Sequence, residues 1–180
     1  MTTAQATGAK ARGRDHEPIR FAFGTCSLGA ILVAATDEGV MAILLADDTD
    51  RLLQDLRARF PTAQLIDGGQ ALVPLVTRIV ELVEMPARGL DLPLDLRGTA
   101  FQRRVWQALR EIQPGATMSY REIAERIGAS QATRAVAQAC SANALAIAIP
   151  CHRVVRTNGT LSGYRWGAAR KRALLEREAA

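Results

Sequence analysis

Residues 149–155 read Ile-Pro-Cys-His-Arg-Val-Val, a run that places a thiol beside an imidazole. A cysteine is a strong nucleophile only as the thiolate, and a neighbouring histidine or a cation such as Arg153 lowers the pKa of a thiol. Pro150 has a fixed backbone angle φ and donates no backbone hydrogen bond. It therefore indicates that Cys151 lies in a rigid loop at the end of a strand over residues 145–149. The alternative is that Cys151 is an inert cysteine packed in the core.

The composition is typical of a soluble globular protein. Of the 180 residues, 48% are hydrophobic and 23% are charged, and the length suits one large domain or two small ones. No apolar run approaches the roughly 20 residues that a membrane-spanning helix needs, and the N-terminus lacks the apolar segment of a secretory signal. There are three cysteines, without Cys-x-x-Cys spacing, and two histidines. We therefore expect no disulfide, no metal site and a reducing, cytoplasmic location.

The charge is unevenly distributed along the chain. Residues 1–96 carry 9 Lys or Arg and 13 Asp or Glu, a net charge of −4, whereas residues 97–180 carry 14 and 5, a net charge of +9. Basic surfaces attract polyanions such as nucleic acids, so residues 97–180 are the part of the chain that favours such a partner. An ordinary solvated basic surface would carry the same charge.

The hydrophobic pattern of the first half predicts a small α+β unit. Residues 1–18 show no hydrophobic period and are predicted to be a disordered tail, which includes His16. Strands are predicted over residues 19–23, 30–36, 39–45, 63–66 and 92–96, with a turn-rich connection over residues 24–29. Helices are predicted over residues 52–60 and 72–83, where apolar residues recur at helical spacing. No motif in this half indicates a chemical site.

Two capping boxes mark helices in the second half. Thr99 with Gln102 and Ser119 with Glu122 can each satisfy free backbone N–H groups at a helix start. Helices are predicted over residues 101–112, 119–127, 131–140 and 168–178, and the second and third of these match a helix-turn-helix. The third helix is rich in alanine, which suits close approach to a nucleic-acid backbone better than the reading of base edges. The alternative is that the alanines only pack the helix tightly against the domain.

The C-terminal residues add a loop and a last helix. Residues 161–167, Leu-Ser-Gly-Tyr-Arg-Trp-Gly, can line a pocket for a planar ligand or simply cover the surface. In the last helix, Leu174 and Leu175 are predicted to face inward and residues 170–172, Arg-Lys-Arg, to face solvent. Glu178 is nearly terminal, a position where a carboxylate is normally solvated.

Together these segments resemble the O6-alkylguanine-DNA alkyltransferase family, and most closely the C-terminal half of the bacterial adaptive-response proteins. The matching segments are residues 97–102, Val105-Trp106, Ser119-Tyr120, residues 134–137, Asn143, residues 149–155 and residues 161–167. The Pro-Cys-His-Arg-Val motif is highly specific in this setting. Residues 19–96 resemble the less distinctive N-terminal part of the family.

The resemblance implies an α+β fold in two parts after the tail of residues 1–18. Residues 19–96 would form an N-terminal RNase H-like subdomain, a small sheet with helices. Residues 97–180 would form a C-terminal winged-helix or helix-turn-helix domain that binds DNA and carries the alkyltransferase site. The four-cysteine zinc domain of the adaptive-response proteins has no counterpart here, so we expect neither a metal nor a cofactor. We expect a monomer that binds no membrane. The sequence leaves open whether copies bind DNA cooperatively and whether the chain is a fragment of a longer regulator.

The resemblance also implies DNA repair by direct reversal of damage. The protein, a methylated-DNA–protein-cysteine methyltransferase, would bind double-stranded DNA containing O6-alkylguanine and flip the damaged base into a pocket. It would then transfer the alkyl group irreversibly to Cys151, once per molecule, with O4-alkylthymine as a second expected substrate. The helix-turn-helix would place its second helix in the minor groove, where Arg134 would fill the vacated space in the base stack.

The resemblance assigns roles to further residues. His152 would act as the base through a water molecule, and Glu178 would orient His152. Tyr120 would donate a proton to the departing guanine, and Asn143 would brace the turn before the active-site strand. The other implied DNA contacts are Ala132, Thr133, Ala135 and Ala137, and the implied pocket residues are Tyr164, Arg165, Trp166 and Val154.

Two other classes of function remain. A non-enzymatic alkyltransferase-like protein recognises lesions without repairing them, but in that group the nucleophile position usually holds tryptophan, so Cys151 argues against it. A cysteine hydrolase would need turnover and an oxyanion hole, and only the Cys-His pair points to such chemistry.

Overall fold

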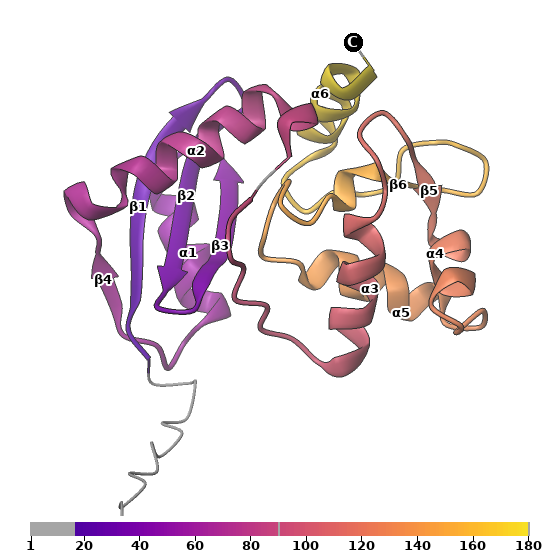
Figure 1. The fold of residues 1–180 in the computed structure, drawn as a ribbon, viewed down its shortest axis with the longest axis horizontal. Helices are drawn as coiled ribbons and strands as arrows, with labels where there is room; N and C mark the ends of the chain where they lie inside the picture. The colour runs from indigo at the N-terminus through magenta and orange to yellow at the C-terminus, as the bar shows by residue number, and fades with distance from the viewer. Residues whose placement is uncertain (1–16, 90, 180) are drawn as a thin grey trace, which may run out of the picture.

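An N-terminal sheet and a C-terminal group of helices lie side by side and share one hydrophobic core (Figure 1). The computed structural model describes residues 17–89 and 91–179. The tail predicted over residues 1–18, including His16, lies outside the described residues except at its last two positions. The mixed α+β architecture is the one that the sequence predicts. No helix in the described part of the chain is long and apolar enough to span a membrane.

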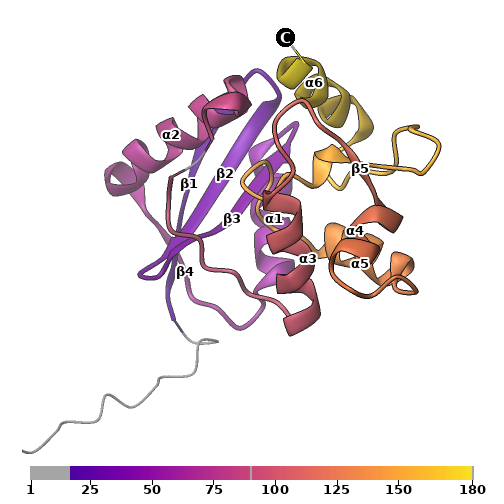
Figure 2. The ribbon, with the colours of Figure 1, turned by 45° about the vertical axis from the view of Figure 1, so that its right-hand side comes forward.

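Four strands form the N-terminal sheet in the order β3-β2-β1-β4. β1 (Ile19–Cys26), β2 (Gly29–Thr36) and β3 (Gly39–Ala46) are antiparallel neighbours, and β4 (Leu65–Asp67) runs parallel to β1. The helices α1 (Thr49–Arg59) and α2 (Val73–Glu84) cover opposite faces of the sheet (Figures 1 and 2). Because both faces are covered, β2 and β3 are apolar along almost their whole length.

The first hairpin is tighter than the sequence predicts. Instead of a turn-rich connection over residues 24–29, β1 continues to Cys26, which pairs with Gly29 at the start of β2. A Cβ at Gly24 would lie 2.6 Å from the side chain of Val76 in α2. Gly24 therefore marks the close approach of a helix to the strand and not a turn.

Six elements make up the C-terminal half. They are α3 (Ala100–Arg110), β5 (Met118–Ser119), α4 (Tyr120–Arg126), α5 (Thr133–Ala142), β6 (Val154–Val155) and α6 (Ala168–Ala179). Short 3-10 turns lie in both halves, at Gly69–Leu72, Pro86–Arg88 and Cys151–Arg153.

Both predicted capping boxes are present, at Thr99 and at Ser119. Trp106 of α3 is buried, and its Nε1 donates a hydrogen bond of 2.9 Å to the Ala139 carbonyl of α5.

The strand predicted over residues 92–96 is absent. This segment meets β3 through one isolated bridge, Val40 with Leu94. The Val40 N–H donates to the Pro93 carbonyl, and the Asp95 N–H donates to the Val40 carbonyl. The segment covers part of the free edge of β3, which explains its apolar residues without a regular strand.

The strand predicted over residues 145–149 is also absent. It makes one isolated bridge, Leu145 with Ile43, and Ile43 exchanges backbone hydrogen bonds with Ala144 and Ala146. The chain then turns at Ile147, whose φ of +68° is rare for a β-branched residue. The apolar run reflects burial between the two halves of the molecule, and it carries the chain from the edge of β3 directly to Cys151.

The outward face predicted for α6 is wrong at Lys171, and Arg170 is also only partly exposed, since it donates to the carbonyls of Leu28 and Trp166. Leu174 is buried as predicted, but Lys171, expected to face solvent, is 0% exposed. Residues three apart lie on the same face of a helix, so Lys171 follows Leu174 into the interior. The polar partners described below accept its ammonium group there.

We expect Gly39→Ala to destabilise the protein more than Gly69→Ala. Both glycines have a positive φ, 143° and 48°. A Cβ on Gly39 would lie 2.4 Å from the Pro93 carbonyl oxygen, whereas a Cβ on Gly69 meets nothing within 4 Å. Urea denaturation should show losses in unfolding free energy of about 3 kcal/mol and about 1 kcal/mol respectively. Equal losses would mean that the contact with residue 93 does not matter to the stability of the fold.

Candidate active site

The loop that carries Cys151 is braced by one buried amide. Asn143 ends α5, and its side chain is fully buried. Its Nδ2 donates to the carbonyls of Leu145 (3.3 Å) and Ile149 (3.0 Å) and to the Cys151 sulfur (3.2 Å). Its Oδ1 accepts from the Leu145 N–H at 2.8 Å. One side chain therefore fixes the path from the end of α5 to the thiol.

A buried carboxylate holds the two residues that follow the thiol. Glu178 Oε1 lies 2.7 Å from His152 Nε2, and the Arg153 guanidinium donates to both Glu178 oxygens at 2.9 Å. Arg153 also donates to the Ile112 carbonyl. The Glu178 and His152 side chains are 0% exposed. His152 Nδ1 is buried and has no hydrogen-bond partner among the described residues, which leaves it free to accept a proton when Nε2 donates to Glu178.

The environment keeps the thiol protonated at rest. Burial raises the pKa of Cys151 to about 11, although the Asn143 hydrogen bond and the charge of Lys171 oppose the rise. The expectation that His152 and Arg153 lower this pKa is wrong, because both side chains are engaged by Glu178. A base must therefore remove the proton when the sulfur reacts.

The pKa values of His152 and Glu178 are both lowered, but for different reasons. Burial lowers the pKa of His152, and the hydrogen bond to Glu178 opposes this. Burial raises the pKa of Glu178, but hydrogen bonds from His152 and Arg153 outweigh it and hold this pKa at about 2. The resting site thus combines a neutral imidazole with an ionised carboxylate, an arrangement that stabilises the imidazolium as it forms.

Cys151 lies at a cavity of about 370 Å³. Two segments form the walls on either side of it. Ala137, Cys140 and Ser141 come from α5, and Gly163, Tyr164 and Arg165 come from the loop before α6. Tyr120, the first residue of α4, completes the lining. The site therefore combines a thiol, an imidazole held by a carboxylate and a space large enough for a planar ring system.

Comparison with known proteins identifies the family. The model of the "6-O-methylguanine DNA methyltransferase, DNA binding domain" matches residues 100–180. The inducible methylated-DNA–protein-cysteine methyltransferase of Bacillus subtilis (strain 168) is 40% identical over 129 residues, which are 72% of each chain. The chain belongs to the methylated-DNA–protein-cysteine methyltransferase family.

Other relatives extend the likeness over nearly the whole chain. The "Bifunctional transcriptional activator/DNA repair enzyme Ada" of Escherichia coli (strain K12) is 50% identical over 167 residues, 93% of this chain and 47% of Ada. This methyltransferase-family chain thus spans about half the length of Ada. The crystal structure of Mycobacterium tuberculosis OGT in complex with DNA superposes with a TM-score of 0.72 at 35% identity, covering 89% of this chain and 92% of that one.

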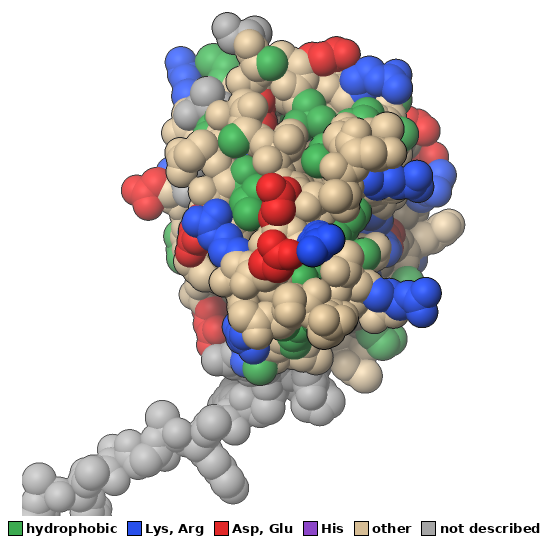
Figure 3. Space-filling view, turned by 90° about the vertical axis from the view of Figure 1, so that its right-hand side faces the viewer, with side chains coloured by type: hydrophobic (Ala, Val, Ile, Leu, Met, Phe, Trp, Pro, Cys, Tyr) green, Lys and Arg blue, Asp and Glu red, His purple; other side chains and the backbone are tan. Residues whose placement is uncertain are grey.

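The two helices that the sequence predicts as a helix-turn-helix in this methyltransferase-family chain are α4 and α5. Thr133 and Arg134 are exposed at the start of α5, whereas Ala132, Ala135 and Ala137 are half-buried. Ala137 also lines the Cys151 cavity. Figure 3 shows that basic side chains lie among acidic ones on the face that carries α4. Two arginines of α4 form ion pairs, Arg121 with Glu125 and Arg126 with Glu111.

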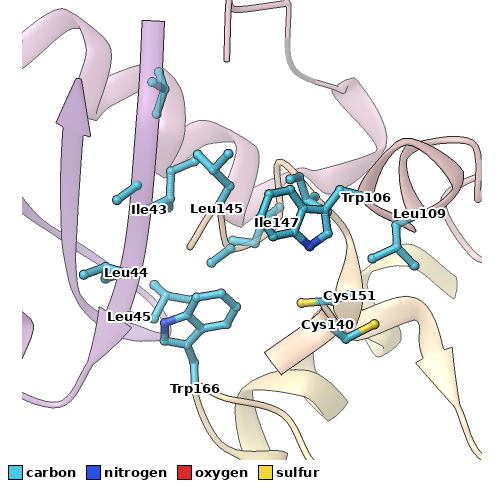
Figure 4. Close-up of a cluster of buried hydrophobic side chains, with 14 of the residues drawn as sticks. Ile43, Leu44, Leu45, Trp106, Leu109, Cys140, Leu145, Ile147, Cys151 and Trp166 are labelled. Carbon is cyan, nitrogen blue, oxygen red and sulfur yellow. The ribbon is translucent and has the colours of Figure 1, made fainter. Parts of the chain in front are cut away.

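Two predicted pocket residues lie elsewhere. Trp166 does not line the Cys151 cavity; it is buried and packs beside Leu45 of β3 (Figure 4). Its neighbours Tyr164 and Arg165 line the Cys151 cavity and also the cavity that Trp166 borders. Val154 is fully buried, and its carbonyl accepts hydrogen bonds from Ser162 (3.2 Å) and Lys171.

Sequence reasoning missed a polar chain next to Tyr120. The Tyr120 hydroxyl donates to Ser162 Oγ at 2.8 Å, and the buried Lys171 ammonium donates to the same oxygen at 2.9 Å. Burial raises the pKa of Tyr120, so the phenol stays protonated. The spacing of Lys171 and Leu174 is the signal that would have revealed the buried lysine. No group of three possible metal ligands occurs in residues 17–89 and 91–179.

Glu178→Gln should remove a pH-dependent part of the stability. The pKa of Glu178 in the folded protein, about 2, lies below the value of about 4.3 for an unfolded chain. The ionised carboxylate therefore stabilises the fold above pH ~4, and this contribution, about 3 kcal/mol, disappears as the pH falls toward 2. The gap in unfolding free energy between the wild type and E178Q, from urea denaturation, should be widest near neutral pH and narrow on acidification.

The control for this experiment is Glu176→Gln, an exposed position of the same helix. It should leave the pH dependence of unfolding as in the wild type. A gap between the wild type and E178Q that stays constant with pH would contradict the assignment of an ionised, hydrogen-bonded carboxylate.

Proposed function

We propose that this protein repairs DNA by moving the alkyl group of O6-alkylguanine to the sulfur of Cys151, irreversibly and once per molecule. One observation carries the proposal: a thiol faces a cavity of about 370 Å³ while the next residue, His152, is held by a buried carboxylate. Family membership supports the same reaction. We extend the proposal to O4-alkylthymine, whose alkyl group is attached to a comparable exocyclic oxygen.

The chemistry follows from the protonation states of the site. The thiol proton passes to His152 Nδ1 through a water molecule, and Glu178 stabilises the resulting imidazolium. The sulfur attacks the alkyl carbon, a carbon–sulfur bond forms, and the bond from that carbon to guanine O6 breaks. The electron pair leaves with guanine, and Tyr120 donates a proton to the departing base. The thioether has no route back to a thiol, so each molecule reacts once.

DNA must present the base outside its stack for this attack. We assign α5 to the minor groove, where Ala132, Thr133, Ala135 and Ala137 permit close approach to the backbone. Arg134, exposed at the start of α5, fills the space that the flipped base leaves. Tyr164 and Arg165 contact the flipped base from the loop, and Asn143 keeps the cavity wall and the thiol in register.

We also propose a finer architecture for the fold. Residues 19–96 form an RNase H-like subdomain, and residues 97–180 form a winged-helix, DNA-binding alkyltransferase domain. The described cysteines Cys26, Cys140 and Cys151 are free thiols, which supports a reducing, cytoplasmic location. We propose that the protein acts as a monomer without a cofactor.

Cys151→Ala should abolish alkyl transfer while preserving binding to damaged DNA, because only the nucleophile is lost. After incubation with a duplex containing O6-methylguanine, peptide mass spectrometry of the wild type should show one methyl group on the Cys151 peptide and no more than one per molecule. Cys26→Ser, which changes a thiol of the N-terminal sheet, should behave like the wild type. Methylation of the C151A protein would place the nucleophile elsewhere, and binding of the lesion without methylation in the wild type would indicate a recognition protein.

Arg134→Ala should weaken binding to a lesion duplex more than binding to undamaged DNA, because the side chain acts only when the base is flipped. The expected selective loss is roughly tenfold in affinity, about the effect of one specific contact. Fluorescence anisotropy with matched duplexes measures both affinities. An equal loss on the two duplexes would make Arg134 an ordinary phosphate contact.

A further inference from the structure

The two walls of the Cys151 cavity come from segments that have little contact with one another through regular structure. One wall belongs to the C-terminal part of α5, and the other is the loop of residues 161–167, which contains no helix or strand. The loop is held near its start by one isolated bridge, Val155 with Leu161, and by the hydrogen bonds of Ser162, and near its end by the buried Trp166 and by α6. The position of its middle residues relative to α5 must therefore be fixed by other contacts.

One carboxylate of the N-terminal half, that of Asp55, is linked to both walls, directly to the loop and through Arg59 to the end of α5. Asp55 Oδ1 accepts a hydrogen bond of 2.6 Å from Arg165 Nη2 of the loop. Its other oxygen accepts from Arg59 Nε, one helical turn further along α1, at 3.4 Å. Arg59 in turn donates to the carbonyls of Ala142 (3.3 Å) and Asn143 (3.5 Å) at the end of α5.

The Arg59 guanidinium is a favourable partner for the end of α5. The last carbonyls of a helix have no partner within the helix and carry the negative end of its dipole, so a guanidinium is favourable there. The Arg59 side chain is only 12% exposed, which limits screening by solvent. Burial lowers the pKa of Arg59, the charge of Arg165 adds to this effect, and Asp55 opposes both. Without Asp55, two guanidinium groups would repel each other across the gap between the loop and α5.

The helix that carries Asp55 and Arg59 is itself well anchored. Leu52 and Leu56 of α1 are almost fully buried against the sheet, at 1% and 0% exposure. Asp48 caps the start of α1 by accepting a hydrogen bond from the Arg51 N–H. A rigid helix therefore presents the carboxylate and the guanidinium at fixed positions.

We propose that Asp55 and Arg59 are positioning residues that hold the two walls of the Cys151 cavity at the separation needed for alkyl transfer, an inference that rests on the proposed function. Neither residue lines the cavity. They act through Arg165 and through the Asn143 segment, whose side chain contacts the sulfur. The N-terminal half thereby contributes to a reaction that takes place entirely in the C-terminal half.

The first test separates positioning from DNA binding. Asp55→Asn should lower the single-turnover rate constant for methyl transfer from an O6-methylguanine duplex about tenfold, because small displacements at a reacting centre have large effects on rate. The affinity for the duplex should stay within about twofold. Asp55→Glu keeps the charge and should recover most of the rate, and Asp37→Asn, which breaks an exposed ion pair with Arg20, is the control without effect.

A double-variant comparison tests the pathway. If Asp55 acts through Arg165, D55N combined with Arg165→Gln should be no slower than the slower single variant. If the two substitutions lowered the rate constant independently, so that their effects multiplied in the double variant, the proposed link between Asp55 and Arg165 would be refuted. Tighter DNA binding by D55N with an unchanged rate constant for methyl transfer would also refute the positioning role. Arg165 would then be a phosphate contact whose charge Asp55 neutralises.

Hydrogen exchange of the DNA-free protein provides a readout that does not depend on the reaction. D55N should exchange faster than the wild type in residues 161–167 and 137–143, and D37N should not. Should D55N fail to fold, R165Q, whose side chain is 37% exposed in the ion pair, should show the same faster exchange in residues 161–167. Unchanged exchange refutes the proposal. If the wild type accepts no methyl group, the proposed function is refuted. Hydrogen exchange still decides in that case whether Asp55 and Arg59 hold the two walls together.

Discussion

The backbone pairing between Ile43 and the segment of residues 144–146 is the constraint on which the rest of the structure depends. Ile43 lies on the free edge of β3, and its N–H and C=O groups are both satisfied by that segment. An exposed strand edge is a liability, and here it is covered by the part of the chain that leads to the nucleophile. Because Asn143 lies immediately before this segment, the same pairing fixes the amide that braces Cys151. The sheet thus determines the position of the thiol without contributing a residue to its cavity.

A thiol with a pKa near 11 is compatible with the single reaction proposed for Cys151. A resting thiolate would be open to oxidation and to any electrophile that enters the cavity. The buried Cys151 instead stays neutral until a base accepts its proton. In the proposed reaction His152 accepts that proton beside Glu178, whose charge Arg153 balances.

Local signals predicted the parts of the fold that depend on local interactions. The capping boxes at Thr99 and Ser119 and the buried face of Trp106 were readable because neighbouring residues decide them. The segments at residues 92–96 and 145–149 were misread because burial along the edge of β3 produces the same apolar run as a strand. The site was predicted in part, since Cys151 and His152 are adjacent in sequence. The roles of Glu178 and Asn143 came only from the resemblance, because long-range contacts are invisible in a single sequence.

The helix α6 shows why such contacts resist prediction. Lys171, Leu174 and Glu178 lie three and four residues apart, so they share one face of the helix. That face enters the interior with a cation at one end and an anion at the other. Lys171 meets the polar chain of Ser162 and Tyr120, and Glu178 meets His152 and Arg153. Composition alone would send both charged residues to solvent, yet each is stabilised by partners that are 9 and 26 residues away. The buried cation and the buried anion therefore come from one short helix, and a shift of that helix would disturb the partners of both at once.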